Sequence, residues 1–221
     1  MQQAIEEALK ADPNKVYPNP LVGCVIVKND KIISRGYHKK FATNHAEVNA
    51  IESLETPVKN ADLYVTLEPC AHFGKNPPCV SAIIKSRMFK KVVIAVADPN
   101  KKAMGGIDEL KKAGIKVFLG DSEKEAKEIN QRFFTFFEKK RPYVILKYAR
   151  TKDGFIAHPD GSSKWITEED ARKDVHITRS GCDAILVGRY TVERDNPSLD
   201  SHGLGTVSYT HLRAHETVLD L

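Results

Sequence analysis

The spacing of apolar residues along the chain predicts helices and strands in alternation. A helix is expected over residues 2–11, followed by a hairpin over residues 21–38 whose two apolar runs flank a Lys-Asn-Asp turn. The pattern then predicts helices over 45–54, 79–87, 107–114 and 122–137, and strands over 61–69, 90–99 and 115–120. This order predicts an α/β fold with helices on both faces of the sheet. The hairpin makes the sheet mixed rather than fully parallel.

Capping residues mark the end of the helix predicted over 107–114 and the start of the helix predicted over 122–137. Gly114 ends the first of them and favours a left-handed C-cap. Ser122 opens the next helix, and Glu125 occupies the capping-box position three residues later. Pro142 follows a charged run and breaks that helix, so we expect the first domain to cover residues 1–141.

A second, shorter alternation of elements begins after Pro142. It predicts a strand, a helix and a second strand, over residues 143–149, 167–181 and 183–188. The alternation is too short to be complete, so we expect a partial domain over residues 142–205. Residues 206–221 do not continue the pattern, and we expect them to be a non-native or disordered tail.

The composition indicates a globular protein, with 41% hydrophobic and 29% charged residues. No apolar run approaches the ~18 residues that cross a bilayer. The first residues lack the basic and apolar regions of a signal peptide, so we expect a cytoplasmic protein with no membrane partner. The net charge of +5 comes mainly from dispersed lysines. Such dispersion disfavours nucleic acid as a partner and suits a phosphorylated small substrate.

The four cysteines do not suggest a disulfide framework. Cys24 and Cys182 lie next to or within predicted strands, where a cysteine is usually a small buried residue. Cys70 and Cys79 differ, because polar, proline-rich sequence surrounds them. These two are therefore candidates for chemistry rather than packing.

His45, Glu47 and these two cysteines form a candidate zinc site. The histidine and the glutamate open a predicted helix, so both side chains can reach past its first turn. A catalytic zinc takes nitrogen and sulfur ligands and keeps three protein ligands with one open position for water. His45, Cys70 and Cys79 meet that count, and Glu47 then stands beside the bound water.

A catalytic zinc with an adjacent glutamate predicts the hydrolytic deamination of an amidine-like ring. Zinc lowers the pKa of its water, and a carboxylate that is not a ligand delivers the proton to the ring nitrogen and the departing amine. Zinc deaminases combine His-x-Glu with Pro-Cys-x-x-Cys, whereas eight residues separate the cysteines here. His-Ala-Glu alone occurs by chance, but its conjunction with Thr-Leu-Glu-Pro-Cys at a strand end is specific.

Longer motifs resemble one family, the bifunctional deaminase/reductase of riboflavin biosynthesis. The resemblance to its deaminase domain rests on YPNPLVGCVIVKNDKIISRGYH, HAEVNAI, YVTLEPCAHFGKNPPC and VVIAVADPN. The resemblance to the start of its reductase domain rests on LKYARTKDGFIA, SKWIT and AILVGRYTVERDNPSL. Over roughly residues 1–205 it implies a cytidine-deaminase-like three-layer α/β/α domain, followed by the N-terminal part of a dihydrofolate-reductase-like α/β domain. Relative to the family, we expect a C-terminally truncated chain.

The resemblance implies deamination of 2,5-diamino-6-(5-phosphoribosylamino)pyrimidin-4-one, and in the family the second domain reduces the product with NADPH. It implies Zn²⁺ at the three ligands named above and proton transfer by the glutamate. It also implies substrate contacts at Asn19, on the pyrimidine edge, and at His72 and Lys75, near the phosphate. Asn76 departs from the family's usual threonine.

The resemblance also implies cofactor and substrate contacts in the reductase domain. The positions that match NADPH contacts are Ala149, Trp165, Thr191 and Asp195. The positions that match substrate contacts are Ser163, Arg179 and Leu199. Arg179 suits a phosphate because guanidinium pairs with it bidentately, whereas His202 stands where the family commonly has arginine.

The apolar pattern of this chain does not include the later strands of the reductase sheet. We therefore expect residues 143–221 to fold poorly alone or to be stabilised by association. The chain is expected to be a homo-oligomer that deaminates its substrate and does not reduce the product.

Two other functions stay open at this point. A nucleic-acid base deaminase of the same superfamily would need a basic groove with stacking aromatic residues. A non-catalytic chain with a structural zinc would need a fourth protein ligand, for which His72 is the sole nearby candidate. The long segment between the cysteines and the dispersed lysines favour the small-molecule deaminase.

Overall fold

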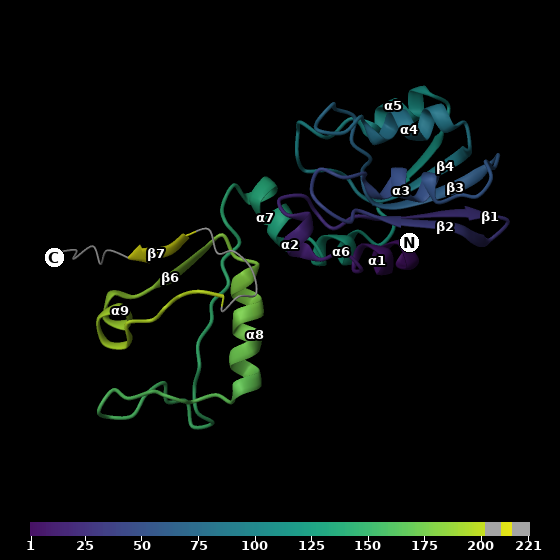
Figure 1. Ribbon diagram of the computed structural model, residues 1–221. Coiled ribbons are helices and arrows are strands. Elements are labelled where there is room, and N and C mark those ends of the chain that lie inside the picture. Colours follow the sequence, from purple (N-terminus) through teal and green to yellow (C-terminus); the bar gives the residue numbers. More distant parts are fainter. Residues whose placement is uncertain (202–208, 214–221) are drawn as a thin grey trace. The chain divides into compact units, whose positions relative to one another are not determined.

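Two units make up the chain, Met1–Val144 and Ile145–Leu221, as residue contacts divide it. The computed structural model describes residues 1–201 and 209–213 (Figure 1). The division lies close to the boundary expected at residue 141. None of the helices in these parts of the chain is both long and apolar enough to cross a membrane.

A five-stranded mixed sheet forms the middle of the first unit, in the order β2-β1-β3-β4-β5. The hairpin strand β1 pairs antiparallel with both β2 and β3, whereas β3, β4 and β5 are parallel. The predicted mixed sheet is therefore confirmed. The strands are β1 Gly23–Lys28, β2 Lys31–Tyr37, β3 Ala61–Leu67, β4 Phe89–Val96 and β5 Lys116–Leu119.

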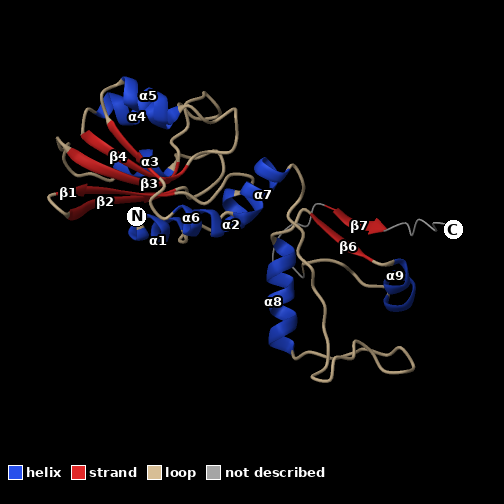
Figure 2. Ribbon diagram, turned by 180° about the vertical axis from the view of Figure 1, so that it is seen from behind, coloured by secondary structure: helices blue, strands red, loops and turns tan. Residues whose placement is uncertain are grey.

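Helices cover both faces of this sheet, as Figure 1 and Figure 2 show from opposite sides. One face carries α3 Ala46–Glu52, α4 Cys79–Ser86 and α5 Gly106–Lys112. The other face carries α1 Gln2–Ala8, α2 Pro13–Val16, α6 Glu123–Glu128 and α7 Gln131–Lys139. This is the predicted three-layer α/β/α arrangement.

Strand β4 contributes to the core on both sides of the sheet, because its residues from Val92 to Val96 are all apolar and buried. Val92 and Ile94 pack in the cluster beneath α3, α4 and α5. Ala95 packs in a second cluster with Phe134 of α7. Successive residues of a strand point to opposite faces, so a continuous apolar run indicates a strand buried on both sides.

The single helix predicted over residues 122–137 is wrong, because the structure breaks it into α6 and α7 at Asn130. The Asn130 side chain accepts a hydrogen bond from the Leu21 amide and donates one to the Leu21 carbonyl, both at 2.8 Å. These bonds hold Asn130 at φ −125° and ψ 29°, outside the helical range. The predicted capping box is also absent: Ser122 sits at φ 61° and its hydroxyl donates to Asp121 instead. The predicted helix end at Gly114 is confirmed, with φ 82°.

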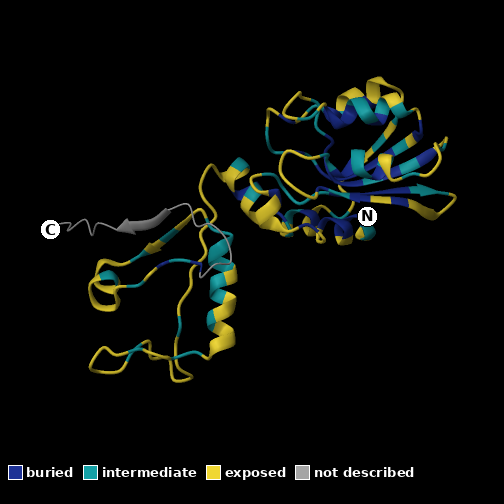
Figure 3. Ribbon diagram, viewed as in Figure 1, coloured by how far each residue is buried: buried dark blue, intermediate teal, exposed yellow. Residues whose placement is uncertain are grey.

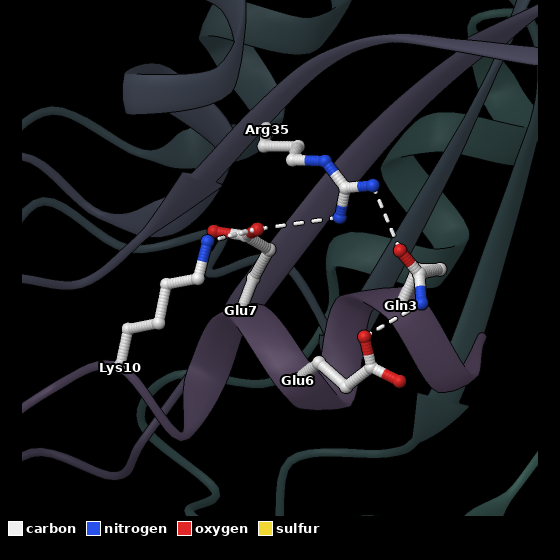
Figure 4. Close-up of polar contacts among 5 residues, drawn as sticks. All are labelled: Gln3, Glu6, Glu7, Lys10 and Arg35. Carbon is white, nitrogen blue, oxygen red and sulfur yellow. Dashed lines mark hydrogen bonds and ion pairs between the residues drawn. The ribbon is translucent and has the colours of Figure 1, made fainter.

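A buried carboxylate joins α1 to strand β2 (Figure 4). Glu7 is 3% exposed, and its Oε1 atom lies 2.6 Å from Lys10 Nζ and 3.3 Å from Arg35 Nη1. Arg35 also donates to Gln3 Oε1 at 2.7 Å, so one guanidinium binds two residues of the helix. Buried charges need such partners, since an unpaired one is costly.

The second unit contains α8 Glu169–Ser180, β6 Ala184–Val187, α9 Arg189–Asp195 and β7 Tyr209–Arg213. Strand β7 pairs parallel with β6, so a strand lies within the segment expected to be a tail. The rest of residues 206–221 lies outside the described residues. Whether that segment is native stays a prediction.

The strand predicted over residues 143–149 is wrong, because the structure has irregular backbone there. Leu146 and Tyr148 are 83% and 64% exposed. Figure 3 colours most of the segment between α7 and α8 as exposed. A strand forms only when a neighbouring strand takes up its backbone hydrogen bonds. The ladder of the second unit that the structure describes pairs β6 with β7 and does not include this segment.

The close packing of α3 on strand β2 depends on a glycine. A Cβ atom at Gly36 would overlap the carbonyl oxygen of Ala46 and the amide nitrogen of Ala50. Both neighbours are backbone atoms of α3, so they cannot give way without moving the helix. Gly36 therefore fixes the distance between this helix and the sheet.

Gly36→Ala should lower the free energy of unfolding by about 1–3 kcal/mol, the usual cost of forcing atoms into a packed interior. Urea unfolding followed by circular dichroism measures the change. Gly188→Ala is the matched control, because a Cβ there meets nothing within 4 Å. A Gly36→Ala variant as stable as the wild type would contradict the close packing.

Candidate functional site

His45 and Glu47 occupy the start of α3, as predicted. His45 is the N-cap residue, with extended φ −76° and ψ 170°, so its side chain projects from the segment before the helix. Glu47 lies in the first turn and is 3% exposed. The N-cap conformation turns the two side chains toward one region, although they are only two residues apart.

Cys70 and Cys79 reach the same place from opposite ends of a long loop. Cys70 lies just after strand β3, and Cys79 is the first residue of α4, behind Pro78 at the N-cap. The Cys79 amide donates to Cys70 Sγ at 3.4 Å, and the Val80 amide donates to the Cys70 carbonyl at 3.3 Å. These bonds tie the end of β3 to the first turn of α4.

His45, Cys70 and Cys79 form a cluster whose ligand atoms all lie within 4.8 Å of one another. His45 Nδ1 lies 3.1 Å from Cys79 Sγ and 3.6 Å from Cys70 Sγ. Hydrogen bonds with the Cys79 thiol and the His45 ring lower the pKa of Cys70 to about 4, against the effect of burial. An imidazole and two cysteine sulfurs are a donor set that zinc prefers, so the residues fit the ion.

Glu47 lies beside this cluster as a carboxyl group that is not part of it. Burial raises its pKa to about 7, and the charge of His45, with a smaller effect from a hydrogen bond with Cys79, opposes that rise. A carboxyl group with a pKa near the working pH can take up and release a proton readily. The geometry therefore fits the predicted proton carrier.

A cavity of about 160 Å³ opens over the cluster, with His45 and Cys70 in its wall. The substrate positions expected from the sequence, Asn19, His72 and Lys75, line the same cavity. The structure thus brings together all the expected deaminase residues, with Glu47 buried beside the ligands. Their roles toward a substrate stay predictions.

His38 belongs to the site and was missed by the sequence analysis. It is 2% exposed and its ring packs edge-on against His45, with 5.1 Å between centroids. Its Nδ1 lies 3.1 Å from the Asn44 carbonyl oxygen, so Nδ1 donates and Nε2 is left to accept from Asn19 Nδ2 at 3.0 Å. Burial lowers the pKa of His38, which favours this neutral form. The only hint in the sequence is its position directly after a strand.

Two contacts join the loops that form the mouth of the cavity. The Lys75 ammonium lies 4.2 Å from the centroid of the Phe41 ring, a cation–π distance. Asn76 donates from Nδ2 to the Thr43 carbonyl at 2.7 Å. Asn76, the departure from the family pattern, therefore has a structural partner in this chain.

Reductase positions lie on separate segments of the second unit. Ala149, Ser163 and Trp165 precede α8, Arg179 is in its last turn, Thr191 and Asp195 are in α9, and Leu199 follows α9. Trp165 is 71% exposed, with the Arg172 guanidinium 4.4 Å from its ring centroid. Leu199 is 3% exposed, and Arg179 donates to the Asp200 carbonyl at 3.5 Å. These positions stay predictions, and His202 lies outside the described residues.

Family models match both units. Residues 1–96 match the cytidine and deoxycytidylate deaminase zinc-binding region, which is the class that the sheet and the His-Cys-Cys cluster define. Residues 142–215 match the RibD C-terminal domain. With both matches in this order, the chain belongs to the RibD family of riboflavin biosynthesis proteins.

Curated relatives and solved structures agree with this assignment. The riboflavin biosynthesis protein RibD of Aquifex aeolicus is 50% identical over 184 residues, which is 83% of this chain and 51% of that protein. The Bacillus amyloliquefaciens protein of the same name is 48% identical over 200 residues, 90% of this chain and 53% of that one. The chain spans about half the length of these relatives.

Among solved structures, the Thermotoga maritima diaminohydroxyphosphoribosylaminopyrimidine deaminase/5-amino-6-(5-phosphoribosylamino)uracil reductase is similar, with a TM-score of 0.80 and 47% identity. The match covers 90% of this chain and 57% of that one. Acinetobacter baumannii RibD gives a TM-score of 0.80 at 45% identity, over 89% of this chain and 55% of that one. The expected family resemblance is confirmed.

Cys79→Ser should reduce zinc content well below one ion per chain, because serine oxygen replaces a thiolate ligand at the helix start. Inductively coupled plasma mass spectrometry on the dialysed protein measures zinc per chain. Cys182→Ser is the matched control, because Cys182 lies in the second unit, where its thiol donates to the Thr178 carbonyl at 3.3 Å. Full zinc occupancy in Cys79→Ser would remove Cys79 from the ligand set.

Proposed function

We propose that this chain catalyses the zinc-dependent hydrolytic deamination of 2,5-diamino-6-(5-phosphoribosylamino)pyrimidin-4-one. The single observation that carries the proposal is the buried carboxyl group of Glu47 beside a cluster of three zinc-type ligands under an open cavity. Three protein ligands and an adjacent carboxyl group are the arrangement of a catalytic site, whereas a structural zinc has four protein ligands. The name of the Thermotoga maritima relative supports the substrate.

Glu47 moves the protons of the reaction. Zinc, when bound, lowers the pKa of water so that it attacks the amino-bearing ring carbon at neutral pH. Glu47 takes one proton from that water and gives it to the ring nitrogen. It then takes the remaining proton from the oxygen that has added to the ring carbon, and supplies it to the amine as the carbon–nitrogen bond breaks. Water and the amino compound thus become the ring carbonyl and ammonia. A pKa of about 7 suits a group that must alternate between the two forms.

Asn19 and Lys75 orient the substrate in this proposal. The amide of Asn19 lines the cavity next to His45, and His38 fixes that amide because its Nε2 accepts from Asn19 Nδ2. An amide can donate to and accept from the edge of a pyrimidine. Lys75 and His72 line the cavity from the loop between the cysteines, where their charge and donors suit the phosphate of the substrate.

A nucleic-acid base deaminase is the alternative within the same superfamily. Parallel assays with the free pyrimidine phosphate and with tRNA separate the two functions, since ammonia release from one substrate only identifies it.

Reduction of the product is not proposed for this chain. The described NADPH positions are spread over several segments and Trp165 is largely exposed, which argues against the preorganised pocket that a cofactor needs. The expected cytoplasmic location and homo-oligomeric state stay predictions.

Glu47→Gln should retain zinc and lose deamination by ~10²–10⁴-fold or more, because an amide cannot carry protons. Ammonia release from the pyrimidine phosphate measures turnover, and metal analysis of the same sample measures zinc. Glu55→Gln is the matched control, because Glu55 is an exposed carboxyl group that follows the same helix. Near-normal turnover by zinc-loaded Glu47→Gln would assign the proton transfer to another group.

A further inference from the structure

Glu68 is a buried carboxyl group that the proposed reaction does not use. It lies directly after strand β3, two residues before the ligand Cys70, and is 5% exposed. Its oxygens accept three hydrogen bonds, all from backbone amides. Oε2 accepts from Asp98 at 3.1 Å, and Oε1 accepts from Gly105 at 3.0 Å and Ile107 at 3.1 Å. A carboxylate that collects several amide donors is strongly bound, since charged acceptors make the stronger hydrogen bonds.

The three donors lie at the two ends of one loop. Asp98 follows β4, whereas Gly105 is the N-cap and Ile107 the second residue of α5. Gly105 has φ 110° and offers no capping side chain, so Glu68 caps α5 from a distant part of the sequence. One carboxylate therefore closes residues 98–105 into a loop of fixed shape, which we call the Glu68 loop.

The Glu68 loop and the first residue of α5 support the backbone on the two sides of Cys70. After the cysteine, the Ala71 amide donates to the Ala103 carbonyl at 3.1 Å. Before it, the carbonyl oxygen of Pro69 lies so close to Gly106 that any Cβ there would overlap it. The segment around Cys70 is thus held by the Glu68 loop on one side and by the start of α5, which Glu68 caps, on the other.

We propose that Glu68 is a positioning residue for the metal centre: it fixes the Glu68 loop and, through that loop, the place of the Cys70 thiolate. The inference rests on the zinc-binding part of the proposed function and not on the identity of the substrate. Residues that orient metal ligands through hydrogen bonds contribute about 10–100-fold to metal affinity when tested by mutation. Glu68 acts through the backbone of the ligand segment rather than through the ligand's side chain.

Glu68→Gln tests the proposal, because it replaces one accepting oxygen by an amide nitrogen that faces backbone donors. Zinc competition with a chromophoric chelator should give an affinity about 10–100-fold below that of the wild type. Cobalt loaded in place of zinc should also show weaker or shifted sulfur-to-metal charge-transfer absorption, since one thiolate is displaced. Glu68→Asp keeps the charge and should restore part of the affinity.

Glu7→Gln is the matched control. Glu7 is an equally buried carboxyl group, but it binds Lys10 and Arg35 and joins α1 to β2. Its loss should lower the free energy of unfolding and leave zinc affinity and the cobalt spectrum unchanged. If Glu68→Gln and Glu7→Gln lost zinc affinity equally, the loss would come from general destabilisation of the fold, and the proposal would be overturned.

An unchanged zinc affinity in Glu68→Gln would also overturn the proposed role of Glu68. If Glu68→Gln does not fold, Glu68→Asp decides the question, because wild-type affinity in that variant contradicts the proposed role and a loss supports it. The measurements need no substrate. A wild type that binds zinc but releases no ammonia would defeat the proposed function and leave the role of Glu68 standing.

Discussion

Close contact between backbone segments, possible only at glycine, determines where the metal ligands lie. Gly36 lets α3 pack against β2 without an intervening side chain, and this fixes the start of α3, which carries His45 and Glu47, relative to the sheet. Gly106 does the same for the segment around Pro69, next to Cys70. The four groups of the site come from two helix starts and one strand end, so small shifts of either helix would separate them. Precise placement by the scaffold is what a metal site needs.

Polar side chains that bind backbone groups reinforce this placement. Glu68 accepts hydrogen bonds from three backbone amides, one just after β4 and two at the start of α5. His38 donates to the Asn44 carbonyl and accepts from the Asn19 amide, which it orients. Asn130 interrupts a helix in order to bind both backbone groups of Leu21. Each satisfies groups that would otherwise be buried without partners. The residues that line the substrate cavity are therefore held in place by other polar residues, which bind the backbone around them.

The sequence predicted the ligands because their chemistry is local: His45, Glu47, Cys70 and Cys79 are of the types that zinc hydrolysis requires. It also predicted the mixed sheet, because a hairpin with a clear turn precedes strands that alternate with helices. It could not predict the roles of Glu68, His38 and Asn130, because each depends on a partner that only the fold brings near. Glu68 binds residues 30, 37 and 39 positions away, and Asn130 binds one 109 positions away.

The wrong prediction of a strand over residues 143–149 has the same cause, a dependence on distant partners. Its apolar pattern is that of a strand, but a strand needs neighbours, and in the parts of the second unit that the structure describes the ladder joins only β6 and β7. Local pattern predicts what a segment can form, and the rest of the fold decides whether it does.

X-ray absorption at the zinc edge of the loaded chain tests the central claim most directly, because it reports the atoms around the ion. The site described here predicts two sulfur neighbours at about 2.3 Å and two lighter neighbours at about 2.0–2.1 Å, one of them an imidazole and the other water. A shell of four protein ligands, or one with fewer than two sulfurs, would contradict an open catalytic site built from His45, Cys70 and Cys79.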